Sequence, residues 1–125
     1  MSENSKNMPD VADGLAIYEE IVNNVDSNKG NLDQLIFDLR HADSNGQFLC
    51  STARFLAAVD REGYAEYLPQ LIESAIEKDR EHRYLGQLLK AIWGDDYAER
   101  TEELKTTDDL FRRLYKRVFA TGTFD

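Results

Sequence analysis

The stretch QFLCSTARFLAAVDRE, residues 47–62, decides the fold that this sequence predicts. Drawn as a helix, it carries its large apolar side chains on one face: Phe48, Phe55, Leu56 and Val59. Much of the remaining surface is small or apolar: Cys50, Ala53, Ala57 and Ala58. Small residues on several sides of a helix let neighbouring helices approach closely. We therefore expect a central helix here, packed on more than one side and ended by Gly63.

Segments on both sides of the central helix have the apolar spacing of amphipathic helices. Two helices are expected before it, in residues 10–25 and after Asn31. Four are expected after it, at about 68–76, 85–93, 96–104 and 107–119. No segment alternates with period two for long enough to predict a strand. The predicted fold class is all-α: a compact bundle of six or seven short helices, with residues 10–119 as one domain and tails at 1–9 and 120–125.

Polar residues precede two of these helices in the pattern of a capping box. In that motif, a side chain at the N-cap and another three residues later bond the free backbone N–H groups of the first turn. Asn31 is followed by Gln34, and Ser44 is followed by Gln47. We expect Asn31 to cap the second helix and Ser44 to cap the central one.

Three short segments echo one another. LDQLI begins at Leu32, LPQLI at Leu68 and LGQLL at Leu85, which gives offsets of 36 and 17 residues. The first offset is comparable to the period of helix-pair repeats, so a short helix-pair repeat array is the alternative fold. However, leucine at i, i+3 and i+4 occurs in any amphipathic helix, and the chain has room for only about three pairs. We prefer the compact bundle.

Composition favours an ordinary globular domain. The chain of 125 residues is 42% hydrophobic and has only two prolines and seven glycines. Its longest uninterrupted apolar run, FLAAV at residues 55–59, is far too short to span a bilayer. A single cysteine excludes an internal disulfide, and the polar N-terminal residues contain no apolar signal region. The expected location is cytoplasmic, without membrane association.

The charge is acidic and unevenly distributed. The formal net charge is −9; residues 1–46 contain three basic and nine acidic residues, a net of −6, whereas residues 99–125 contain six of each. Nucleic-acid phosphates would repel such a chain, so direct binding to nucleic acid is not expected. A basic protein partner fits this charge, although solubility is the commoner reason for it.

Both histidines follow an aspartate by three residues, in DLRH at 38–41 and DREH at 79–82. Paired carboxylate-x-x-His motifs build di-metal sites inside four-helix bundles, provided that the ligands point inward. His41, however, projects nearly opposite the apolar stripe of its helix, and the charged run around His82 predicts a turn. Surface histidines at helix ends are the preferred interpretation, and no metal is expected.

Residues 41–52, HADSNGQFLCST, resemble the middle of a calcium-binding loop. Such loops need an oxygen ligand at the first position and a bidentate glutamate at the last. Those positions hold His41 and Thr52, so we interpret the segment as an interhelix turn.

Catalytic signatures are missing from the sequence. Cys50 lies in an apolar helix with only Arg54 as a nearby cation, which predicts a buried, unreactive thiol. The chain contains no G-x-S-x-G, Walker or G-x-G-x-x-G motif. The acidic pairs at 95–96 and 108–109 stand at predicted helix starts, where they favour the helix dipole. We expect neither an enzyme nor a cofactor.

The remaining functional class is a small acidic protein-binding domain: an adaptor, regulator or inhibitor of a basic protein partner, in a sharper version one that imitates nucleic-acid phosphates. The expected partner surface consists of Asp10, Asp13, Glu19, Glu20, Asp33 and Asp38. Its aromatic anchors are expected among Tyr18, Trp93 and Tyr97.

The last helix supports the alternatives. One half of its surface is apolar, and the other carries Arg112, Arg113, Lys116 and Arg117. Such a basic amphipathic helix can bind nucleic acid or an anionic surface, or its cations can pair with the acidic first third of the same chain, which we prefer. Homo-oligomerisation through an extra apolar face and a di-metal carboxylate/His bundle also stay open.

Overall fold

The computed structural model describes residues 11–23 and 31–120. Within these ranges the elements are α2 (Val11–Asn23), α3 (Leu32–Ala42), α4 (Gln47–Asp60), α5 (Leu68–Lys78), α6 (Gly86–Trp93), the 3₁₀ helix η1 (Tyr97–Arg100), α7 (Thr101–Thr107) and α8 (Asp109–Ala120). The described residues contain no strand, so the predicted all-α fold is confirmed. None of these helices has the length and apolar content needed to cross a membrane.

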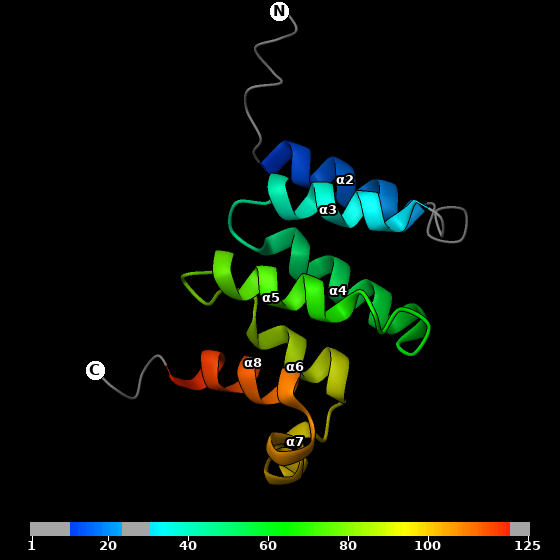
Figure 1. The fold of residues 1–125 in the computed structure, drawn as a ribbon. Helices are drawn as coiled ribbons and strands as arrows, with labels where there is room; N and C mark the ends of the chain where they lie inside the picture. Colours follow the sequence, from blue (N-terminus) through cyan, green and yellow to red (C-terminus); the bar gives the residue numbers. More distant parts are fainter. Residues whose placement is uncertain (1–10, 24–30, 121–125) are drawn as a thin grey trace, which may run out of the picture.

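The helices are arranged as three successive layers of helix pairs (Figure 1). The pairs are α2 with α3, α4 with α5, and α6 with α8, while η1 and α7 lie beyond the third layer. Contacts also join α2 to α4 and α4 to α6, and we call these three helices row A. On the opposite side, α3 contacts α5 and α5 contacts α8, and we call these three helices row B. The two rows bury one shared apolar core between them.

The helix that the sequence predicted to be central is α4. It contacts α2, α3, α5 and α6, as its small residues indicated. The stripe that it buries matches the predicted one only in part. Phe48 and Leu56 are buried, as predicted, and Leu49 and Ala53 are buried beside them. Phe55 is only partly buried, and Val59 is 47% exposed. The neighbouring helices cover the Leu49–Leu56 side, and periodicity alone does not reveal where neighbours lie.

Two buried aspartates begin the loops that join one layer to the next. Oδ2 of Asp43 accepts hydrogen bonds from the backbone N–H groups five and six residues later, at 2.9 and 2.8 Å. Oδ2 of Asp79 does the same five and six residues later, at 2.7 and 3.0 Å. Three residues after each aspartate the backbone has positive φ, 88° at Gly46 and 57° at His82. The two loops therefore share these features 36 residues apart, although α4 begins four residues after Asp43 and α6 begins seven residues after Asp79.

This recurrence gives the 36-residue echo a structural basis. LDQLI and LPQLI lie in α3 and α5, which occupy equivalent places in row B. LGQLL lies at the start of α6 in row A, so the 17-residue offset relates helices that are not equivalent. The compact bundle is confirmed, and the two loops that join its layers are held by aspartates in equivalent positions.

The capping predictions need correction. Ser44 is exposed, and the cap of α4 is Asp43, which takes four backbone N–H groups in all. Asn31 occupies the N-cap position of α3 but makes no side-chain capping bond. The central helix ends at Asp60, three residues before Gly63. Asp43 lies one residue before the expected cap and reaches forward across the loop to the first turn of α4, an arrangement that the local capping-box pattern does not describe.

Candidate functional site: two charged helix surfaces

The acidic surface lies on the first layer. Glu19 and Glu20 are exposed near the end of α2, and Asp33 is exposed in the first turn of α3. The two helices are antiparallel neighbours, so these carboxylates lie at the same end of the layer (Figure 1). Asp38 is half-buried and accepts a bond from Gln34 at 3.0 Å. Of the other predicted residues, Asp13 lies in α2, and Asp10 lies outside the described residues.

Phe37 is the residue of this surface that the sequence analysis missed. Its side chain is 52% exposed, although it belongs to a helix whose other large apolar residues are buried or half-buried. Its ring lies 4.4 Å from the ring of His41, whose Nδ1 bonds the Phe37 carbonyl oxygen at 2.8 Å. The available signal was its position off the stripe formed by Leu32, Ile36 and Leu39. We call Asp33, Phe37, Asp38 and His41 the α3 surface.

One of the three predicted aromatic anchors is buried. Trp93 was expected to be exposed, but it is 4% exposed, and its Nε1 donates to Oδ2 of Asp108 at 2.8 Å. Its ring packs edge-on against Phe111, with 5.2 Å between ring centres. Tyr97 and Tyr18 are half-buried against the core. The correction follows from the tertiary fold, because α8 packs on α6 and covers Trp93.

The cations of α8 divide into two groups. Arg112 pairs with Asp109, one turn earlier, and Arg113 pairs with Glu73 of α5 at 2.9 Å. Lys116 and Arg117 are exposed and form no ion pair with any residue that the structure describes. The expected pairing with the acidic first third does not occur among the described residues. The third layer carries α8, and α5 separates it from α3.

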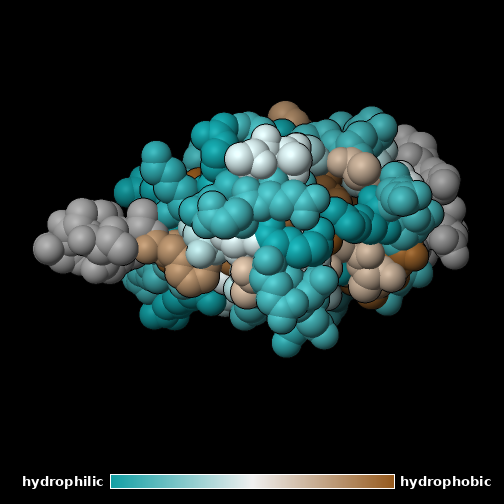
Figure 2. Space-filling model, turned by 90° about the horizontal axis from the view of Figure 1, so that it is seen from below, coloured by the Kyte–Doolittle hydropathy of each residue, from teal (hydrophilic) through white to brown (hydrophobic). Residues whose placement is uncertain are grey.

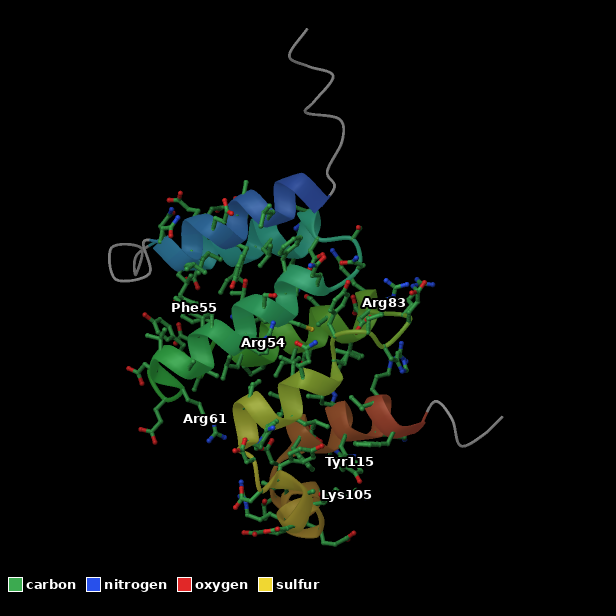
Figure 3. The ribbon with its side chains drawn as sticks, turned by 180° about the vertical axis from the view of Figure 1, so that it is seen from behind. Arg54, Phe55, Arg61, Arg83, Lys105 and Tyr115 are labelled. Carbon is green, nitrogen blue, oxygen red and sulfur yellow. The ribbon has the colours of Figure 1, made fainter. Side chains whose placement is uncertain are left out.

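A shallow groove runs between α7 and α8. It is lined by Lys105, Arg112, Tyr115, Lys116 and Phe119. The Lys105 ammonium lies 4.9 Å from the centre of the Tyr115 ring, beside which it is seen in Figure 3. The Tyr115 and Phe119 rings are 4.5 Å apart, and Phe119 is 47% exposed. We call this groove with Arg117 the α8 surface.

Seen from the C-terminal end, the molecule is mostly hydrophilic. Figure 2 shows apolar residues next to the grey C-terminal segment and scattered elsewhere among polar side chains. An exposed aromatic among cations is therefore a local feature of this end, and not part of an extended apolar face.

The two carboxylate-x-x-His motifs are not brought together. His41 is on the exposed side of α3, whereas His82 lies in the loop before α6. Asp79 is 2% exposed and holds the backbone of that loop. The residues that the structure describes contain no group of three or more His, Cys, Asp or Glu positioned to hold a metal ion. The opening residue of DREH is thus a loop cap.

Cys50 is buried in α4. Burial raises the pKa of its thiol to about 12, and the charges of Asp79 and Asp43 add to this effect. The thiol is therefore neutral and a poor nucleophile at neutral pH.

We expect Cys50 in the folded protein to resist a thiol reagent such as iodoacetamide at pH 8 and to react once the chain is unfolded. The pKa is higher in the folded state than its ordinary value of 9.0, so the unfolded state loses its proton first. This residue should therefore reduce stability as the pH rises above about 9. Mass spectrometry before and after denaturation checks the reactivity, and rapid alkylation of the native chain would contradict it.

Comparisons with known proteins add no assignment: no family model, curated protein or solved structure matches this chain.

Proposed function

We propose that this protein is a protein-interaction module that binds a basic partner through the α3 surface. The observation that carries the proposal is Phe37, a large aromatic side chain 52% exposed beside acidic residues. Aromatic residues at the centre of an interface supply much of its binding energy once a partner excludes water from them. Flanking carboxylates accelerate encounter with a basic surface and fix its orientation.

The rest of the described structure supports a binding role over chemistry. Asp43 and Asp79 use their carboxylates to hold loops, and Cys50 is buried with a raised pKa. Layered helix pairs also form a rigid support on which an exposed helix face can be presented. These two carboxylates and this thiol are thus part of the fold and not of an accessible site.

The version of this function that imitates nucleic-acid phosphates receives less support. Phe37 interrupts the carboxylates of α3, and Arg40, which donates to Ser74 at 2.7 Å, adds a cation to the same helix. A row of phosphates offers its receptor neither an aromatic ring nor a positive charge. A basic protein surface with an apolar pocket fits the α3 surface better.

Affinity capture from native extract at physiological salt tests the proposal. We expect wild-type protein to retain a protein partner that Phe37→Ala weakens by about 2 kcal/mol, roughly 30-fold in Kd. Asp33→Lys should weaken it as well, because the substitution brings a cation to a basic partner. Val59→Ser is the matched control, since it removes an exposed apolar side chain from row A.

Two results would contradict the proposal. One is a partner retained equally by wild type, Phe37→Ala and Asp33→Lys. The other is capture of nucleic acid alone, lost on changing Lys116 and Arg117, which would assign binding to the α8 surface instead.

A further inference from the structure

We infer that two copies of this chain associate antiparallel through row B, with the α3 surface of each copy docked on the α8 surface of the other. This inference rests on the proposed function, because it uses the same α3 surface and names its partner. It also gives the basic surface of α8 a ligand.

The two surfaces are complementary in charge and in form. The α3 surface presents an exposed ring, Phe37, beside the carboxylates of Asp33 and Asp38. The α8 surface presents an exposed ring, Phe119, beside Lys116, and a groove with an aromatic wall. The acidic helix face of one copy thus meets the cationic groove of the other. Each surface also contributes an apolar side chain, and association removes both side chains from water.

One chain cannot satisfy this complementarity by itself. The α3 surface is on the first layer and the α8 surface is on the third, with α5 between them in row B (Figure 1). The described parts of α3 and α8 do not contact each other. The ion pairs that α8 does make, to Asp109 and Glu73, leave Lys116 and Arg117 without an acidic partner among the described residues.

The order of the helices in row B, α3 then α5 then α8, allows two copies to form a closed dimer. A two-fold axis across α5 places α3 of one copy opposite α8 of the other, and it creates both contacts at once. Such an isologous dimer closes on itself, which is the commonest symmetry of homo-oligomers, whereas a single head-to-tail contact would build open filaments. Glu73 on α5 is already paired with Arg113, and this pairing reduces like-charge repulsion near the axis.

The net charge of −9 opposes association of two copies at long range. At physiological salt the Debye length is about 8 Å, so this repulsion is screened while contacts within the interface are retained. We therefore expect dimerisation to depend on local charge pairs within the interface.

Light scattering after gel filtration, over a concentration series, tests the dimer. The wild-type mass should approach twice 14.4 kDa as the concentration rises. An acid-reversed variant, Asp33→Lys with Asp38→Lys, should stay monomeric, and so should a base-reversed variant, Lys116→Glu with Arg117→Glu. In a mixture of the two variants, both contacts of the mixed dimer pair opposite charges, so dimerisation should return.

A matched control reverses two exposed cations of row A. Arg54→Glu with Lys90→Glu changes the net charge as much as the base-reversed variant does, but at residues outside row B. It should dimerise like wild type, and circular dichroism should show that all variants are folded.

Several outcomes overturn the inference: a monomeric wild type throughout the series, a dimer that survives both reversals, or a mixture that stays monomeric. If the wild type is monomeric while a captured partner still depends on Phe37, the proposed function stands and this inference fails. If the dimer behaves as expected but no other protein is captured, the α3 surface serves self-association only, and the proposed basic partner is replaced by a second copy.

Discussion

Replacing Asp79 with alanine should lower the free energy of unfolding by about 3–5 kcal/mol, one of the two largest effects that we expect from a single substitution. Its carboxylate is 2% exposed and accepts the backbone N–H groups of Arg83, Tyr84 and Leu85 at 2.7–3.0 Å. Alanine would leave three donors without acceptors, and each buried unsatisfied donor costs about 1–3 kcal/mol. Water that enters the loop recovers part of this loss. Urea unfolding followed by circular dichroism measures it.

Three further variants test whether the lost backbone hydrogen bonds cause this destabilisation. Asp79→Asn keeps one acceptor oxygen and should lose less than Asp79→Ala. Asp43→Ala should lose a comparable amount, because Asp43 holds the equivalent loop through four N–H groups. Glu81→Ala removes an exposed carboxylate from the Asp79 loop and should change stability by less than about 0.5 kcal/mol. A loss below about 1 kcal/mol for Asp79→Ala would show that the cap does not hold the layers.

The two aspartates show where interpretation of the sequence reached its limit. Asp79 was considered as a metal ligand, and Asp43 as part of a calcium loop, because carboxylates near histidine or in a D-x-N-G segment suit such sites. A carboxylate that bonds backbone N–H groups looks the same in a sequence. The signal that distinguishes them is the 36-residue offset. Asp43 lies eleven residues after Leu32, and Asp79 lies eleven residues after Leu68, the leucines that begin the two similar segments.

Helix positions were predicted well because apolar spacing and helix-ending residues are local properties. Pro69 lies in the first turn of α5 and Gly94 directly follows α6, which are positions where these residues favour a helix start and a helix end. Which face each helix buries depends on its neighbours. Trp93 was expected on the surface and is covered by α8, whereas Phe37 received no assignment and is exposed. A single sequence gives the periodicity of a helix but not the position of the next layer.

Substitutions of the adjacent residues Leu56 and Phe55 test which face of α4 is buried. Leu56 is fully buried, and Leu56→Ala should cost about 3–5 kcal/mol, because the cavity adds to the lost burial. Phe55 is the larger residue, and the sequence placed it on the same apolar face as Leu56, but it is only partly buried. Phe55→Ala should therefore cost about 1–2 kcal/mol, well below the 3–5 expected of a fully buried phenylalanine.

The order of the two losses is the test, since hydrophobicity and size alone predict the opposite order. Both substitutions leave alanine in the same turn of α4, so helix propensity contributes little to the difference. Urea unfolding of both variants beside wild type measures the two losses. A greater loss at Phe55 than at Leu56 would mean that α4 is rotated about its axis, so that its neighbours cover Phe55 more completely than Leu56.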